Sequence, residues 1–257
     1  RERCEATRAL VERIDWPCEV EKNYADENMG CRQRLASGID WAFQRAEELI
    51  VLEDDCLPHP SFFGYCEALL EHYRHQPKVV QVSGCNLQHG RRRGEGSYYF
   101  SRYNHVWGWA SWRRAWQGYD PAMADWPEVR ESSWLEHWLG DAELVSVWRR
   151  IFDEVHAGKI DTWDYQWTYA CWRKGGLTAL PNVNPISNLG FRPDATHTVA
   201  NSPYAALPLK PMRWPLRHPA VIARNDEADR YTEYDHHYRS RPPSLRKRLS
   251  RWLRGVH

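Results

Sequence analysis

The chain has 257 residues, of which 42% are hydrophobic and 27% charged, with a formal net charge of +1. This composition is typical of a globular protein and argues against a disordered chain. The nearly balanced charge offers no field that would attract nucleic acid, so no nucleic-acid partner is expected. No apolar run approaches the roughly 18 residues of a membrane span.

The first eighty-odd residues alternate between helical and strand patterns. Such alternation is typical of an α/β fold with a mainly parallel sheet. The expected elements are a helix over residues 2–13, a short strand near Cys18–Val20, a helix after Gly30, a strand over 49–52, a helix with Phe62, Cys66, Leu69, Leu70 and Tyr73 on one face, and a strand over 78–84.

The remainder of the chain is more varied, with long loops between its elements. We expect a first domain over residues 1–200 and a proline-rich polar extension over 201–257. The expected elements are a polar loop over 89–97, a strand over 98–103, a loop entering a helix over 104–116, a helical region broken near Gly140, a helix over 161–174 with Asp161 or Thr162 as N-cap, a short strand, and a loop over 187–198.

The seven cysteines are odd in number and widely spaced, and no two form a CxxC pair. A zinc knuckle is therefore not expected. Reduced thiols in a cytoplasmic protein fit this pattern better than a disulfide framework.

An acidic cluster, Glu53, Asp54 and Asp55, follows the strand expected over 49–52. Adjacent carboxylates repel one another, and a hard divalent cation at the carboxyl end of a strand would offset that cost. Alternation of side chains would turn Glu53 and Asp55 to one side and Asp54 to the other. The alternative is an acidic turn that caps a helix beginning near Ser61. Spacing does not decide between these two.

Several short stretches resemble, in order, the motifs of GT-A glycosyltransferases, with similarity to the N-acetylglucosaminyltransferase I-like group and to bacterial family 2-like transferases. "LEDD" followed by "CLPHPSFF" resembles the metal motif, and "NMGCRQRLASGIDWAF" the segment before it. "FSRYNHVWGWASWRRAW" resembles the Gly-Trp loop at the sugar site. "TWDYQW" resembles the segment of the catalytic base, and "NPISNLGFRPDATHT" the loop over the sugar nucleotide. The resemblance covers residues 4 to 200.

The resemblance implies a Rossmann-like GT-A enzyme that transfers a sugar with inversion from a nucleotide-diphosphate donor to a hydroxyl acceptor. It implies a divalent metal, usually Mn²⁺ with Mg²⁺ possible, bound by Asp55. Glu53 and Asp54 would position the metal's waters, the ribose or the sugar. A cation there would stabilise the charge that develops on the leaving diphosphate. The expected acceptor is an envelope glycan or lipid-linked saccharide.

An inverting transfer also needs a carboxylate that takes the acceptor's proton. On the resemblance this catalytic base is Asp164, with Asp161 as the second choice. From the residues alone, an acid in the first turn of a helix, favoured by the helix dipole, is the preferred explanation. In the loop over 187–198, His197 and Arg192 would bind the donor's phosphates. Gly190 would let this loop hinge over the donor.

The Gly-Trp loop provides the candidates for sugar binding. Trp107 and Trp109 flank Gly108, and glycine permits close approach of a ligand to the backbone. Either indole could stack on a sugar ring, and either could instead belong to the core.

The resembling fold normally opens with strands that grip the nucleobase, and this chain lacks them, so we expect an N-terminally truncated domain. A non-catalytic carbohydrate-binding or regulatory module, an inactive fragment, and a metal-dependent phosphoesterase are the alternatives. At the other end, residues 245–256 predict a basic amphipathic helix. It would either contact the inner face of the membrane peripherally or pack on the domain.

Overall fold

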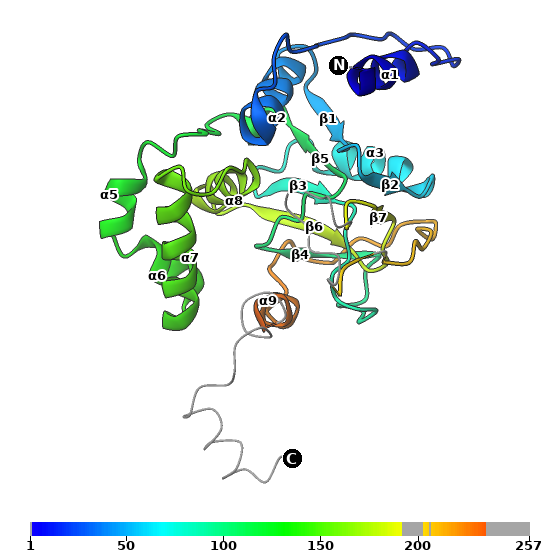
Figure 1. The fold of residues 1–257 in the computed structure, drawn as a ribbon. Coiled ribbons are helices and arrows are strands. Elements are labelled where there is room, and N and C mark those ends of the chain that lie inside the picture. The colour runs from blue at the N-terminus through cyan, green and yellow to red at the C-terminus, as the bar shows by residue number, and fades with distance from the viewer. Residues whose placement is uncertain (1, 192–202, 206, 235–257) are drawn as a thin grey trace.

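The computed structural model describes residues 2–191, 203–205 and 207–234. It has a mixed α/β fold built on a five-stranded sheet in the order β1-β5-β3-β6-β4, with a separate two-stranded sheet of β2 and β7 (Figure 1). The strands are β1 Glu48–Val51, β2 Cys56–Pro58, β3 Val79–Ser83, β4 Tyr98–Ser101, β5 Trp109–Trp112, β6 Leu177–Pro181 and β7 Ile186–Asn188.

The large sheet is mostly antiparallel, so the prediction of a mainly parallel sheet was wrong. Only β3 and β6 pair in parallel, whereas β1–β5, β3–β5 and β4–β6 are antiparallel. The cause is β5, which falls in a stretch expected to be a loop and inserts between β1 and β3. Because β1 and β3 are both antiparallel to β5, they run in the same direction as each other and as β6. Their carboxyl ends lie at one edge, here called the carboxyl edge.

The helices follow several of the expected signals, and the break at Gly140 is confirmed by its left-handed conformation (φ 70°). The predicted strand near Cys18–Val20 was wrong, since this segment is exposed and belongs to no strand among the described residues. The helices are α1 Glu2–Val11, α2 Gly30–Phe43, α3 Ser61–Tyr73, α4 Arg113–Trp116, α5 Trp126–Glu131, α6 Trp134–Leu139, α7 Ala142–His156, α8 Asp164–Arg173 and α9 Asp226–Glu233.

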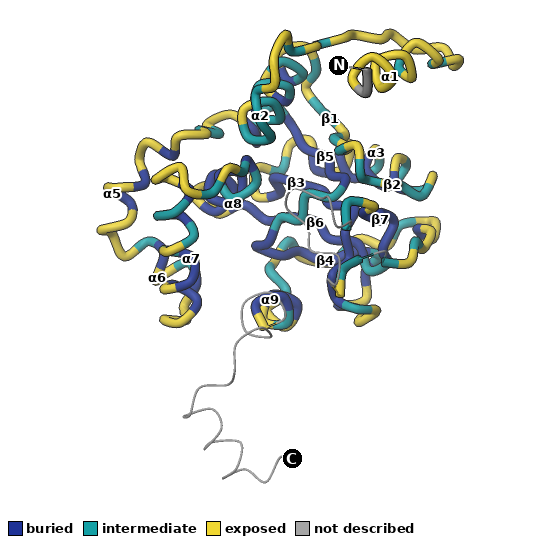
Figure 2. The backbone as a smooth tube through the Cα atoms, in the orientation of Figure 1, coloured by how far each residue is buried: buried dark blue, intermediate teal, exposed yellow. Residues whose placement is uncertain are grey.

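The strands of the large sheet and much of α8 are buried (Figure 2). Aromatic side chains fill much of the core between them. Trp109 of β5 packs on Trp163 and Trp167, each with ring centroids 5.7 Å away. The indole of Trp167 is fully buried and donates a hydrogen bond of 2.6 Å to Gln81 Oε1 on β3. The buried tryptophans are Trp109, Trp112, Trp116, Trp126, Trp148, Trp163, Trp167 and Trp172.

The described part of the extension after residue 200 packs on the sheet. Helix α9 is capped by Asn225, whose side chain accepts a hydrogen bond from Ala228 N. Its Asp229 is 1% exposed and accepts a 2.5 Å hydrogen bond from Ser101 Oγ at the end of β4. Arg102 lies 3.4 Å from the Asp229 carboxylate and 3.2 Å from that of Glu233. Burial raises the pKa of Asp229 to about 6 even beside this arginine.

The amphipathic segment expected over 245–256 lies outside the described residues. Within residues 2–191, 203–205 and 207–234, no helix combines the length and the apolar character that crossing a bilayer requires.

Replacing Trp167 by alanine should lower the free energy of unfolding by about 4 kcal/mol, because the change removes a buried indole and leaves the Gln81 amide without its donor. Trp16→Ala is the control, since that side chain is 62% exposed and its loss should cost less than about 0.5 kcal/mol. Urea unfolding measures both, and equal effects would contradict the packing described.

Candidate functional site

The three predicted carboxylates lie in a tight turn between β1 and β2, at the carboxyl edge of the sheet. Cys56 N donates a 3.0 Å hydrogen bond to Glu53 O and closes the turn. Glu53 and Asp55 are half-buried and Asp54 is exposed, which agrees with the expected alternation. We call residues 53–55 the acidic turn.

The acidic turn does not cap α3, because β2 intervenes between the two. The first turn of α3 is served by His59 instead. Its Nδ1 accepts a 3.1 Å hydrogen bond from Ser61 N, and its carbonyl accepts one of 2.8 Å from Phe62 N. The carboxylates are therefore left without a capping role at this helix.

Pairing of β2 with β7 brings a distant part of the chain onto the acidic turn. Cys56 is opposite Asn188 in the antiparallel register, and Leu189 N donates a 2.7 Å hydrogen bond to Asp55 O. Gly190 approaches so closely that a Cβ built on it would lie 2.2 Å from Asp55 Oδ2. The loop expected over the donor therefore begins directly against the predicted metal ligand.

Burial and neighbouring charges act together on Glu53 at this edge. Burial, followed by the charges of Asp55, Asp164 and Asp54, raises the pKa of Glu53 to about 7. The neighbouring Cys31 thiol, at the start of α2, has its pKa raised to about 11 by burial and then by Glu53, Asp161, Asp164 and Asp54. Asp164 therefore lies within electrostatic reach of the acidic turn, although it is more than one hundred residues away in sequence.

Asp164 is the first residue of α8, which leads through a short turn into β6. This order directs the N-terminus of α8 to the carboxyl edge. Asp164 Oδ1 accepts hydrogen bonds from the Thr162 hydroxyl and, at 3.0 Å, from Tyr165 N. The predicted N-cap at Asp161 or Thr162 was wrong, because α8 begins after Trp163 without a side-chain cap. Asp161 is exposed and lies 3.4 Å from the guanidinium of Arg32.

A cavity of about 370 Å³ adjoins Asp164 on its other side. Trp107, half-buried, is one wall of this cavity, here called the aromatic pocket. The loop that carries Trp107 is fixed to β3, since His105 O accepts hydrogen bonds of 2.8 Å from Gln81 and 2.7 Å from Ser83. The pocket is lined by Leu87, Tyr103, Asn104, His105, Val106, Trp107, Trp148, Asp164, Tyr165, Thr168 and Thr232.

The other two residues of the Gly-Trp loop are packed against protein. Trp109 is 0% exposed and offers no ring face to a sugar. Gly108 adopts φ +64°, and a Cβ there would lie 2.6 Å from Ile186 Cδ1. In this structure it is Ile186 of β7 that approaches the Gly108 backbone closely, where a ligand was expected. Of the loop's sugar-binding candidates, Trp107 is the one that lines a cavity.

The donor set suits a hard cation held partly by its substrate. Among the residues that the structure describes, no group of three His, Cys, Asp or Glu side chains could hold a metal by itself. Carboxylate oxygens are nevertheless the ligands that Mn²⁺ and Mg²⁺ prefer, and one or two of them with phosphate oxygens and water complete such a site. His197 and Arg192, expected at the phosphates, lie outside the described residues.

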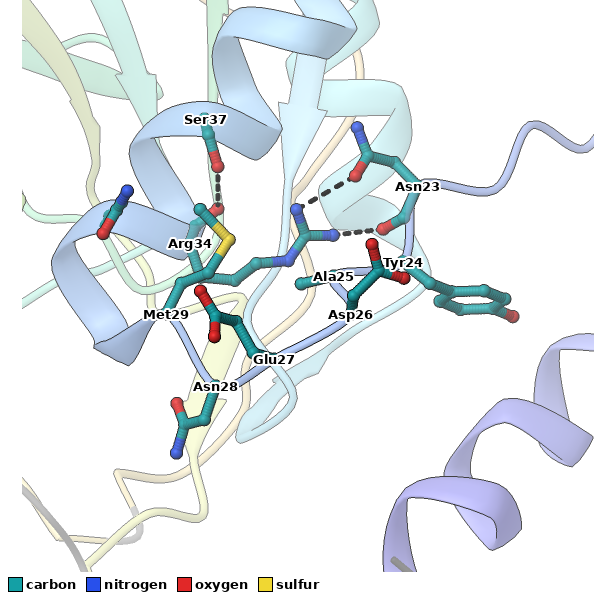
Figure 3. A pocket seen from close by; sticks show the side chains of 10 residues that line it. Asn23, Tyr24, Ala25, Asp26, Glu27, Asn28, Met29, Arg34 and Ser37 are labelled. Atoms are coloured by element: carbon teal, nitrogen blue, oxygen red, sulfur yellow. Dashed lines mark hydrogen bonds between the residues drawn. The ribbon is translucent and has the colours of Figure 1, made fainter.

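A larger cavity, of about 700 Å³, lies between the segment 23–29 and α2 (Figure 3). Arg34 points into it, but its guanidinium is already bound to the side chain and carbonyl of Asn23. Asp26 and Glu27 on its rim are exposed. These features favour the smaller aromatic pocket, which adjoins the carboxylates, as the place where chemistry would occur.

Sequence reasoning missed Asn104, Tyr165 and Thr168, which line the aromatic pocket. Single polar residues in a loop or on a buried helix face carry no pattern that would have marked them. A scan against protein-family models finds no match for this chain, and a search of curated proteins finds none either.

Alanine at position 190 should force the Asp55 carboxylate to rotate, at a cost of about 1 kcal/mol in the free energy of unfolding. Most of this cost should disappear when Gly190→Ala is made in the Asp55→Ala background, because the closest atoms are then gone and the approach of Asn188 Oδ1 at 3.0 Å is the contact that remains. Gly38→Ala is the matched control in the interior of α2, where no such contact exists; there alanine should stabilise by up to about 1 kcal/mol. Additive costs in the double variant would contradict this contact.

Glu53→Gln should stabilise the metal-free protein by about 1 kcal/mol at pH 8 and leave it unchanged at pH 4. The folded pKa of Glu53 is raised from 4.5 to about 7, so the folded chain binds the proton more tightly. Stability from this group is complete below pH 4.5 and is lost as the pH rises through 7. Urea unfolding at both pH values tests this, with Glu67→Gln on the exposed face of α3 as control. A pH-independent effect would refute the raised pKa of Glu53.

Proposed function

We propose that the protein is a metal-dependent glycosyltransferase of the GT-A type, which transfers a sugar with inversion from a nucleotide-diphosphate donor to a hydroxyl acceptor. The observation that carries the proposal is the position of Asp164. It is electrostatically coupled to Glu53 of the acidic turn, and it also lines the aromatic pocket. A base for this reaction must lie between the donor and the acceptor hydroxyl.

The GT-A arrangement is part of the proposal. Supporting it, β1, β3 and β6 run in one direction and end at the edge where the acidic turn, the Gly-Trp loop and the start of α8 meet. Ligands of open α/β sheets bind outside the carboxyl ends of such strands.

In this proposal Asp55 is the protein's ligand for a divalent cation, with Mn²⁺ preferred and Mg²⁺ accepted. When bound, the cation would supply positive charge for the leaving diphosphate. Glu53 and Asp54 would orient its waters or the donor's hydroxyls. Gly190 would keep the loop backbone beside Asp55, where a larger residue would displace the carboxylate.

The base is Asp164. Its Oδ1 is engaged by Thr162 and Tyr165 N, which fixes the carboxylate's orientation and leaves Oδ2 for an acceptor hydroxyl. In the transfer, the acceptor oxygen forms the new bond to the anomeric carbon as the bond to the diphosphate breaks, and its proton passes to Asp164. Asp161, exposed and beside Arg32, is the weaker candidate.

Titration calorimetry of UDP and GDP with and without Mn²⁺ tests the proposal. Binding of one nucleotide should require both Mn²⁺ and Asp55, with Asp55→Ala weakening it at least about tenfold. Asp164→Asn should bind the nucleotide normally but lower turnover of the corresponding nucleotide sugar by about 10²–10⁴-fold. Asp15→Ala, which removes an exposed carboxylate elsewhere, is the control.

A folded chain that binds neither nucleotide would overturn the proposal. Saccharide binding without nucleotide binding would instead indicate a carbohydrate-binding module. Metal-dependent cleavage of a simple phosphate ester would indicate a phosphoesterase, although hydrolases of that kind draw ligands from several strand ends.

A further inference from the structure

Residues 207–224, here called the strap, lead along α3 and β4 into α9. Met212 N donates a 2.9 Å hydrogen bond to Ser61 Oγ at the start of α3, and the Met212 side chain is buried in the core. Arg217 N donates another of 2.9 Å to Ser97 Oγ, just before β4. These contacts hold the strap against α3 and β4, and the strap in turn positions α9.

Two stacked histidines add a further contact between the strap and α3. The ring centroids of His218 on the strap and His72 on α3 lie 4.0 Å apart, with the ring planes inclined by 7°. The hydroxyl of Tyr98 lies 2.7 Å from His218 Nδ1 and 2.6 Å from the hydroxyl of Tyr73. Both tyrosines are buried, whereas both histidines are exposed. An imidazole at the surface thus ends a chain of hydrogen bonds that begins in the core.

This arrangement suits neutral imidazoles and disfavours charged ones. A neutral His218 with its hydrogen on Nε2 accepts from the Tyr98 hydroxyl through Nδ1. Protonation places a hydrogen on Nδ1, so Tyr98 must turn its own hydrogen towards Tyr73. If His72 is protonated as well, two like charges face each other across the stack. Burial, followed by the charge of His72, lowers the pKa of His218 from its usual 6.5.

The other charged groups near the stack do not offset this repulsion. On α3, Glu67 and Glu71 line a cavity on the β1 side of the helix, and Glu71 is paired with Arg74 at 2.7 Å. His218 borders a different cavity, of about 470 Å³, at the edge of β4. Three arginines and one carboxylate line this second cavity, so its charge is positive on balance. They are Arg93, Arg217, Arg224 and Glu95.

We infer that the stack of His72 on His218 is a pH-sensitive latch, which holds the strap on α3 at neutral pH and releases it in acid. Histidine is the side chain whose charge ordinarily changes between pH 5 and 8. Because the folded chain binds the His218 proton less tightly than the unfolded chain, the stabilisation is complete above pH 6.5 and is lost as the pH falls below it. The strap leads into α9, whose Thr232 lines the aromatic pocket, so release would loosen one wall of that pocket.

Amide hydrogen exchange of the full chain at pH 7.5 and pH 5.5, corrected for intrinsic exchange rates, tests the inference. The reporters are the amides of Met212 and Arg217, which are bonded across the contact. Their protection should fall about tenfold at the lower pH, the effect of one pKa unit. His72→Phe keeps a ring in the stack without the second charge and should remove most of this fall. His72→Lys places a permanent charge there and should lower the protection already at pH 7.5.

Controls separate a local release from general unfolding in acid. His75→Phe alters an exposed histidine just beyond the end of α3 and should behave like the wild type. The amide of Val145, bonded to Asp141 O within α7, should keep its protection at both pH values. Titration of the imidazole resonances should show the pKa of His218 rising towards 6.5 in His72→Phe. Unchanged protection of the strap in acid, an equal fall in His72→Phe, or an equal fall at Val145 would overturn the inference.

Discussion

Packing of α8 on the sheet through Trp167 is the constraint on which the site depends. The indole is buried between Trp109 and Trp116 and is hydrogen-bonded to Gln81 of β3. If α8 rotated or slid, the indole would leave a cavity in the close-packed aromatic core and the Gln81 amide would lose its donor. That restriction fixes the rotation of the helix, and with it the position of Asp164 at one end and of Thr168 one turn later.

The acidic turn is the opposite kind of feature, because it destabilises the fold that holds it. Glu53 and Asp55 are half-buried, and burial, followed by the charges of Asp55, Asp164 and Asp54, raises the pKa of Glu53 to about 7. Such a cluster lowers the stability of the folded chain. A cation bound at the carboxyl edge of the sheet would turn the repulsion among these carboxylates into attraction. The strain is local, since β2 pairs with β7 immediately after the turn and holds its backbone in place.

Local patterns in the sequence predicted elements whose burial is continuous or strictly periodic. Helix α3 buries the expected face, Phe62, Cys66, Leu69, Leu70 and Tyr73, and strands β1, β3 and β4 were predicted within about two residues. Strand β5 was missed because a four-residue aromatic stretch after a glycine has no distinguishing period. Its insertion then reversed the expected sheet directions, since strand direction is decided by pairing and not by local sequence.

Long-range pairing explains the other failures of prediction. β2 and β7 have three residues each and meet across more than one hundred residues, so neither has a local signal strong enough to reveal it. The acidic turn could be identified from sequence because charge repulsion in three adjacent residues is itself a signal. The aromatic pocket could not, since its walls come from segments far apart in sequence that meet in the folded chain.

Helix α9 shows how the segment after residue 200 bears on the site. Thr232 lines the aromatic pocket, and the neighbouring Asp229 and Glu233 are fixed by Arg102 and Ser101 at the end of β4. Tyr103, which follows Arg102, also lines the pocket and donates a 3.0 Å hydrogen bond to Glu233 Oε1. Removing one member of a buried ion pair is costly because the partner keeps its charge without compensation. Loss of Arg102 would therefore loosen two walls of the pocket together, Thr232 through α9 and Tyr103 through its hydrogen bond to Glu233 of the same helix. The pocket's shape thus depends on a helix that the first two hundred residues do not contain.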